Sequence, residues 1–182
     1  MNMENKSQKN IYMETIKLIL IFIVLHIILA IIFTILFFTF ARYNILTTHP
    51  FAALYIEGNP LFYIICNSFL HSFIYFLFGL LTAKIIKTTN NKKSLITACV
   101  ICGFLQMLSW IFMLMLAYPG NEGLILAMIL NPLVFWSMNG IININDLRSV
   151  LTVLYYLLPT IAFFFGIYIN NKLFKKTNKT SE

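Results

Sequence analysis

Hydrophobic residues in this chain fall into four long runs that contain no charged residue: Leu18 to Phe40, Leu61 to Ala83, Leu95 to Ala117 and Val150 to Ile169. At 1.5 Å per residue, helices over these runs extend about 30 to 35 Å, enough to cross a hydrocarbon core of about 30 Å. An unpaired backbone amide in lipid costs several kcal/mol, so runs of this kind are expected to be helical. The pattern predicts an all-α fold, a polytopic membrane helical bundle with four transmembrane helices in one integral membrane domain over residues 1–182.

A fifth apolar segment, residues 124–138, is harder to assign. It is short, and Asn131-Pro132 interrupts it. A proline removes a backbone hydrogen bond and restricts the residue before it, so a continuous helix is disfavoured there. Apolar segments of this length are more typical of re-entrant or interfacial elements. We expect a short re-entrant or interfacial helix on the outer side, with a true fifth span as the alternative.

Positive charge is distributed unevenly between the two sides that four spans define. If the N-terminus is cytoplasmic, the inner segments hold 11 basic residues and the outer ones hold only Arg42 and Arg148. A fifth span would change this division to 8 against 5. Because Lys and Arg are retained on the cytoplasmic side, the asymmetry predicts a multi-pass protein of the cell membrane with both termini in the cytoplasm.

Composition agrees with a membrane location. The chain is 60% hydrophobic and only 10% charged, whereas about a quarter of the residues in a soluble globular protein are charged. The lysines lie in short flanks without interleaved aromatic residues, so they predict contact with the lipid bilayer and no nucleic acid partner. The abundance of Ile, Asn and Lys suggests an AT-rich bacterial gene.

The second and third runs each carry a stripe of small and polar residues. In the second run the stripe includes Gly79 and covers one side of the helix. In the third run, Cys99 and Gly103 form a small-xxx-small pair of the kind that lets two helix backbones approach closely. We expect Gly79, Cys99 and Gly103 to serve in helix packing, and the two stripes to face each other.

Four polar residues are expected near the middle of the membrane: His26, Asn67, His71 and Gln106. By the helical rise, His71 and Gln106 lie about 15 Å below the surface. Such residues commonly hydrogen-bond across packed helices and hold a bundle together. Ionisable residues inside a membrane also mark solute and proton pathways. The intramembrane polar cluster is therefore interpreted as structural, with a solute site or a proton relay as the alternative.

No motif in the sequence indicates a reaction. The chain contains no H-E-x-x-H, Walker loop or G-x-S-x-G pattern, and no carboxylate inside a run. We therefore expect no catalytic residue, metal site or cofactor. The sequence favours a small non-catalytic integral membrane protein that acts through helix-helix contacts with another membrane protein or with itself as a homo-oligomer. The alternative is a small transporter, or the membrane component of a transport system, that uses the midplane cluster for a ligand of unknown identity.

Overall fold

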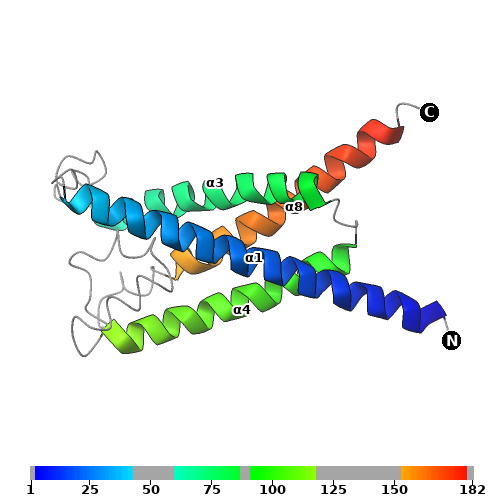
Figure 1. The fold of residues 1–182 in the computed structure, drawn as a ribbon, viewed down its shortest axis with the longest axis horizontal. Helices are drawn as coiled ribbons and strands as arrows, with labels where there is room; N and C mark the ends of the chain where they lie inside the picture. The colour runs from blue at the N-terminus through cyan, green and yellow to red at the C-terminus, as the bar shows by residue number, and fades with distance from the viewer. Residues whose placement is uncertain (1–2, 43–59, 87–90, 118–152, 180–182) are drawn as a thin grey trace.

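The computed structural model describes residues 3–42, 60–86, 91–117 and 153–179. These residues form four α-helices: α1 (Met3–Arg42), α3 (Pro60–Ile86), α4 (Lys92–Ala117) and α8 (Leu154–Lys179) (Figure 1). Within these ranges no strand occurs. The prediction of an all-helical fold is confirmed for the described part of the chain.

Three of the four described helices are long and apolar enough to cross a membrane, over Asn10–Ile32, Ser68–Ile85 and Lys92–Phe112. Helix α8 is not among them. Its apolar part from Leu154 to Ile169 extends only about 24 Å, and a polar, lysine-rich segment follows. The structure therefore supports a multi-pass membrane protein, while the count of four spans is not confirmed. Residues 124–138, for which a re-entrant helix is expected, lie outside the described residues.

Two helices extend well beyond the apolar runs. The first charge-free run begins at Leu18 and the last ends at Ile169, but α1 begins at Met3 and α8 continues to Lys179. A helix satisfies its backbone hydrogen bonds internally, and Lys, Glu and Gln are good helix formers. The helices therefore continue from the apolar core into the polar flanks.

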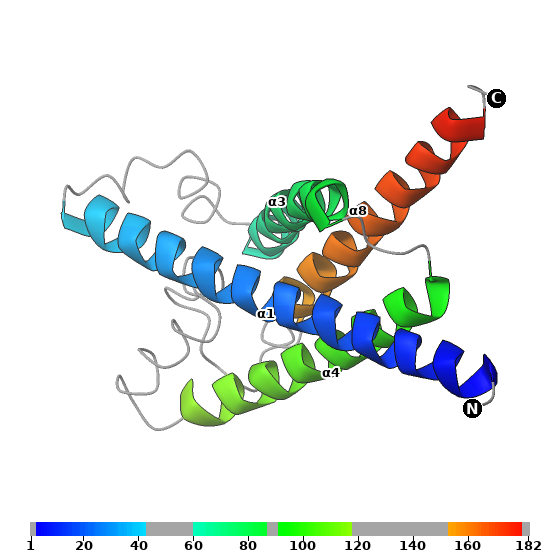
Figure 2. The same cartoon turned by 45° about the vertical axis from the view of Figure 1, so that its right-hand side comes forward.

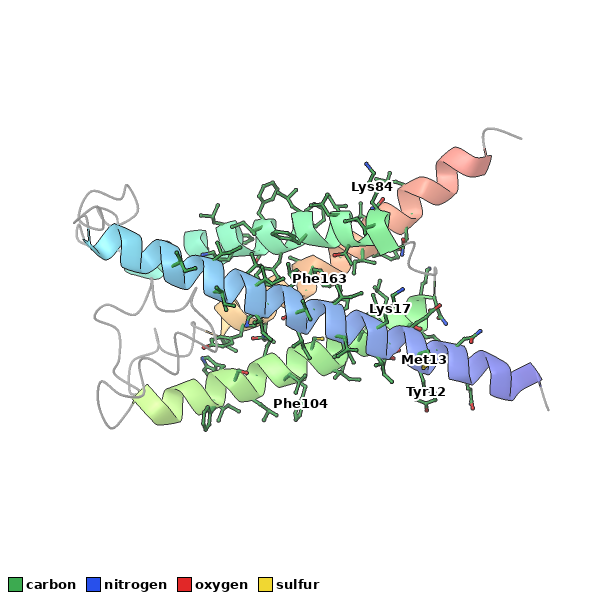
Figure 3. All side chains as sticks on the ribbon, viewed as in Figure 1. Tyr12, Met13, Lys17, Lys84, Phe104 and Phe163 are labelled. Atoms are coloured by element: carbon green, nitrogen blue, oxygen red, sulfur yellow. The ribbon has the colours of Figure 1, made fainter. Side chains whose placement is uncertain are left out.

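The helices run in alternating directions. Helices α1 and α4 point one way and α3 and α8 the other, so the start of α1 and the end of α8 lie at the same end of the bundle (Figures 1 and 2). Lys17 and Lys84 lie toward that end in Figure 3. The first residues of α4, Lys92 and Lys93, are there too. Lysines from all four helices thus gather at one end of the bundle.

Contact between helices is unequal. The pair α3 and α8 is in the most extensive contact, followed by α4 with α8 and α1 with α4. Helices α3 and α4 form no comparable interface in the described part, so the expectation that their polar stripes face each other is wrong. Gly79 of the α3 stripe packs against Phe163 and Gly166 of α8, and large aromatic side chains fill the centre of the bundle. Figure 3 shows Phe163 at this centre, whereas Phe104 points away from it.

Candidate functional site

Helices α3 and α8 approach each other closely at two glycines. A Cβ atom added to Gly79 would overlap the backbone carbonyl of Phe163 and would lie 3.2 Å from the Cα of Gly166. A Cβ added to Gly166 would overlap the carbonyl oxygen of Phe76. Small residues allow this kind of approach in membrane helices. We call the contact formed by Gly79, Leu80, Phe163, Gly166 and Asn170 the α3–α8 seam.

A hydrogen bond reinforces the seam. The Asn170 side-chain Nδ2 donates to the backbone carbonyl of Leu80 at 2.6 Å, and Asn170 is buried. A buried polar group without a partner costs free energy, so this bond satisfies the amide inside the contact. The seam is therefore closely packed and its amide is paired.

The other expected packing residues have a different environment. An added Cβ at Gly103 would meet nothing within 4 Å among the described residues. Cys99 is half-buried. The close approach expected at Gly103 is thus absent from the described helices, because α4 meets α8 and α1 without backbone-to-backbone contact at this position. Gly166, which the sequence stripes did not include, takes the corresponding place beside Gly79.

The predicted polar side of α3 is the side that is buried. Ser68, His71 and Ser72 are each less than a tenth exposed, and Ser72 Oγ donates to the Ser68 carbonyl at 2.6 Å. His71 lies one turn before Tyr75, another buried residue of this face. The side chain of Asn67 falls outside the described residues. The structure thus places His71 in the bundle interior.

His26 connects α1 to α3. Its Nδ1 atom and the Tyr75 hydroxyl form a hydrogen bond of 2.7 Å. The Phe22 ring stacks near His26 at a centroid distance of 6.0 Å and meets Phe163 at 5.4 Å. Helix α1 is therefore joined to α3 and α8 by aromatic and imidazole side chains, in contrast to the backbone contact of the seam.

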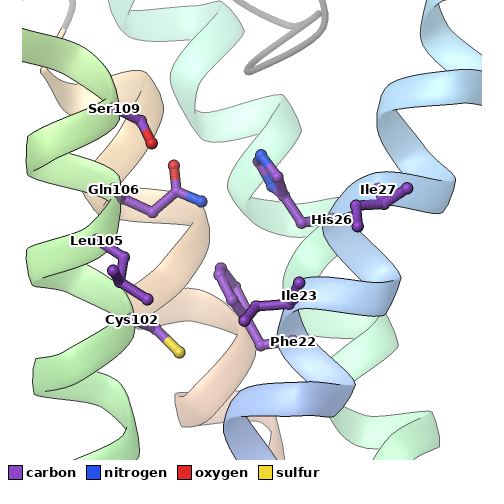
Figure 4. Close-up of a pocket in the computed structure, with 8 residues that line it drawn as sticks. All are labelled: Phe22, Ile23, His26, Ile27, Cys102, Leu105, Gln106 and Ser109. Carbon is purple, nitrogen blue, oxygen red and sulfur yellow. The ribbon is translucent and has the colours of Figure 1, made fainter. Parts of the chain in front are cut away.

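A cavity of about 280 Å³ lies between α1 and α4 (Figure 4). One side of α1 lines it with Phe22, Ile23, His26 and Ile27. One side of α4 lines it with Cys102, Leu105, Gln106 and Ser109. In both sets the residues are spaced so that they share a helix face. We call this space the α1–α4 cavity.

The cavity lies where the two helices separate. Near the start of α4 the two helices are in contact, since Ser94 Oγ lies 3.3 Å from the Ile11 carbonyl oxygen and 3.3 Å from a Glu14 carboxylate oxygen, and its single O–H can donate to either one. Toward their last turns α1 and α4 diverge, as both views show (Figures 1 and 2). Small side chains at Cys102 and Ser109 leave the widening gap unfilled.

Gln106 is the distinctive group of the cavity. Its side chain extends from α4 toward α1 (Figure 4) and is only 7% exposed. The Oε1 atom accepts no hydrogen bond from any described residue. A buried acceptor left in this state costs about 1 to 3 kcal/mol. Gln106 therefore carries an unused acceptor in the wall of the cavity, and the carboxamide must turn about its side-chain bonds for an entering molecule to reach this oxygen.

Two of the four residues expected in a midplane cluster, His26 and Gln106, line this one cavity, whereas His71 is not among its lining residues. Sequence reasoning did not single out Ser109 or Asn170. It also assigned no role to Tyr75, which lies deep within the second apolar run. A deep hydroxyl needs a hydrogen-bond partner, and this signal could have linked Tyr75 to His26. Asn170 lies just past an apolar run and resembles a flank residue.

The described residues include no group of three His, Cys, Asp or Glu side chains placed to hold a metal ion. Comparison of the chain with protein-family models, with curated proteins and with solved structures finds no match. The helices and the cavity are therefore the observations from which a function can be argued.

Proposed function

We propose that this protein is a non-catalytic multi-pass membrane protein that binds a small molecule within the bilayer, as a small transporter or the membrane component of a transport system. The α1–α4 cavity supports this proposal, because it combines apolar walls with the unpaired acceptor of Gln106. Ligand sites are commonly concave and mostly apolar, with a few polar groups that fix orientation. The sequence alone favoured a protein acting through helix contacts; the cavity shifts the balance to ligand binding.

The chemistry of the cavity lining argues against catalysis. Its thiol, Cys102, and its imidazole, His26, are the residues that a nucleophile and a base would require. His26 Nδ1 is hydrogen-bonded to the neutral Tyr75 hydroxyl and not to a carboxylate, which is the partner that strengthens a catalytic imidazole as a base. The eight lining residues include no carboxylate. Binding without covalent chemistry fits this set better.

The position of the lysines supports a bacterial cell-membrane topology in which four crossings leave both ends in the cytoplasm. Helix α8 then serves as a short fourth span. In a variant lacking the three native cysteines, a new cysteine at Ser181 should react with an impermeant maleimide only after the membrane is opened. A cysteine at Thr47 should react in intact cells. A tail that reacts in intact cells contradicts the topology.

Photolabelling in lipid vesicles tests the binding proposal. A trifluoromethyl-phenyldiazirine is small, apolar and partitions into bilayers, and ethylbenzene serves as its competitor. We expect ethylbenzene to reduce labelling of α1 and α4 in a saturable way. Ser109→Phe, which fills the cavity, should abolish the saturable component. Ile111→Phe is the matched control, because Ile111 lies on α4 but does not line the cavity. Labelling that never saturates, or that Ser109→Phe leaves unchanged, contradicts the proposal.

Association with another helix is the second candidate, and the open surroundings of Gly103 favour it. A glycine in an apolar helix with space around it can accept a partner backbone. In a chain otherwise lacking cysteine, Gly103→Cys should then form a disulfide between two copies under mild oxidation. Absence of this product, together with absence of a co-purifying partner, contradicts this candidate.

A further inference from the structure

The α1–α4 cavity has an inner and an outer part of different character. Phe22, Cys102 and Gln106 are buried on the inner side. On the outer side Ile23, Ile27 and Leu105 are more than a third exposed on the surface of the described bundle. In a membrane that surface faces hydrocarbon. The arrangement therefore gives a molecule dissolved in the lipid a route between α1 and α4 to Gln106.

The lining excludes charge. None of its residues carries a full charge, apart from the capacity of His26 to gain a proton. Transfer of an ion to an apolar medium without a partner is costly, far more so than transfer of a hydroxyl or amide. No carboxylate lines the cavity to pair with a cation, and no lysine or arginine lines it to pair with an anion. The cavity is suited to an uncharged ligand.

Gln106 determines which polar group a ligand of the cavity should carry. The free Oε1 accepts hydrogen bonds and cannot donate them. A ligand that carries an O–H or N–H group can satisfy this atom, whereas a hydrocarbon leaves it unpaired. Among apolar ligands of equal size, one with a donor should therefore bind more tightly.

The volume of the cavity limits the size of its ligand. An engineered protein cavity of about 150 Å³ binds benzene. The α1–α4 cavity, at about 280 Å³, is roughly twice as large. It accommodates a molecule with the bulk of one or two aromatic rings, and is far too small for a whole phospholipid.

We infer that the ligand of the α1–α4 cavity is an uncharged, mainly apolar molecule about the size of one or two aromatic rings. It carries a hydroxyl or N–H donor, enters from the lipid phase and forms a hydrogen bond to Gln106. This inference rests on the proposed function, since it specifies the ligand of the same site. It assigns Gln106 as the residue that determines specificity.

Three competitors with equal numbers of non-hydrogen atoms test the inference: benzyl alcohol, ethylbenzene and benzylammonium. Each competes with the diazirine in vesicles that contain the full-length protein, at known mole fractions in the lipid. We expect benzyl alcohol to compete at about threefold to tenfold lower mole fraction than ethylbenzene, the range that one net hydrogen bond supplies. Benzylammonium should compete at least tenfold more weakly than either.

Gln106→Leu provides the matched variant. It keeps a side chain of similar bulk but lacks the acceptor, so benzyl alcohol and ethylbenzene should become equal competitors. Gln106→Met serves the same purpose if the leucine variant does not fold. Ile111→Phe should retain the preference for the alcohol.

The outcomes separate the two proposals. Saturable competition without a preference for the alcohol, or a preference that survives Gln106→Leu, overturns the inference and leaves the proposed function standing. Stronger competition by benzylammonium also overturns the inference, because it reveals a cation site. No competition by any of the three shows that lipid chains or water fill the cavity, and contradicts the proposed function as well.

Discussion

The α3–α8 seam and the α1–α4 cavity are two regions of the same bundle that differ in how closely their helices pack. In the seam, Gly79 and Gly166 bring two backbones together, and the Asn170 amide donates to the Leu80 carbonyl. In the cavity, α1 and α4 diverge and the buried amide oxygen of Gln106 accepts no bond from the described residues. A buried amide thus occurs in both places, paired in one and unpaired in the other.

This difference suggests a division of labour. Buried polar groups in proteins are normally hydrogen-bonded, so an exception requires an explanation. Evolution commonly tolerates a loss of stability where function requires it. The seam then holds the bundle together, while under the proposed function the unpaired group of the cavity serves a ligand. Amino-acid replacements at the two sites should therefore have different, and in one case opposite, effects.

The largest effect is expected from an added methyl group in the seam. Gly79→Ala places a Cβ against the Phe163 carbonyl, so α3 and α8 must separate. Overpacking of this kind costs about 1 to 3 kcal/mol, and a clash with backbone lies at the upper end. The free energy of unfolding, measured by SDS titration with circular dichroism, should fall by about 3 kcal/mol. Gly103→Ala is the matched control and should cause no loss, because its Cβ meets no described atom. Equal losses would show that the seam is not closely packed.

Asn170→Leu should weaken the seam by less. The variant removes the hydrogen bond to the Leu80 carbonyl and preserves most of the side-chain bulk. Interhelical hydrogen bonds in membranes contribute about 0.5 to 2 kcal/mol. The same titration should show a loss within this range. An unchanged or increased stability would mean that the bond does not hold α3 to α8.

Gln106→Leu should raise the free energy of unfolding, in contrast to the two replacements in the seam. Removing an unpaired buried acceptor and replacing it with an apolar side chain of similar size relieves a desolvation penalty. In the absence of added ligand, we expect the free energy of unfolding to rise by about 1 kcal/mol. A loss of stability as large as that of Asn170→Leu would show that Gln106 is paired and structural.

The smallest effect is expected where α1 meets α3. Tyr75→Phe removes the hydroxyl that bonds to His26 and keeps the ring that packs near Phe22. Double-mutant cycles on comparable intramembrane bonds average about 0.6 kcal/mol. A cycle with His26→Phe, read by the same titration, should give a coupling of this size. A coupling near zero would contradict the bond.

Much of the architecture follows from the sequence because lipid restricts the alternatives. Charge-free runs of about twenty residues can only be helices in a bilayer, and all four runs coincide with described helices for most of their length. Helix ends were predicted less well. The flanks at Met3 and Lys179 are helical because helix propensity, and not hydrophobicity, decides there.

The site was predictable only in part. His26 and Gln106 were identifiable as deep polar residues, and both line the cavity. Which helices face each other depends on packing, and the stripe on α3 could equally have met α4 or α8. Gly166 became visible as the partner of Gly79 only once α3 and α8 were seen in contact. The cavity could not be predicted from the sequence, because its presence depends on the angle at which α1 and α4 diverge.

The most direct test of the central claim is to map where the diazirine attaches. Peptides from α1 and α4 that contain Phe22 to Ile27 and Cys102 to Ser109 should carry label that benzyl alcohol displaces. Peptides from the seam, which contain Phe163 to Asn170, should carry only label that does not saturate. Displaceable label on the seam, or none between α1 and α4, would contradict the assignment of the cavity as the binding site.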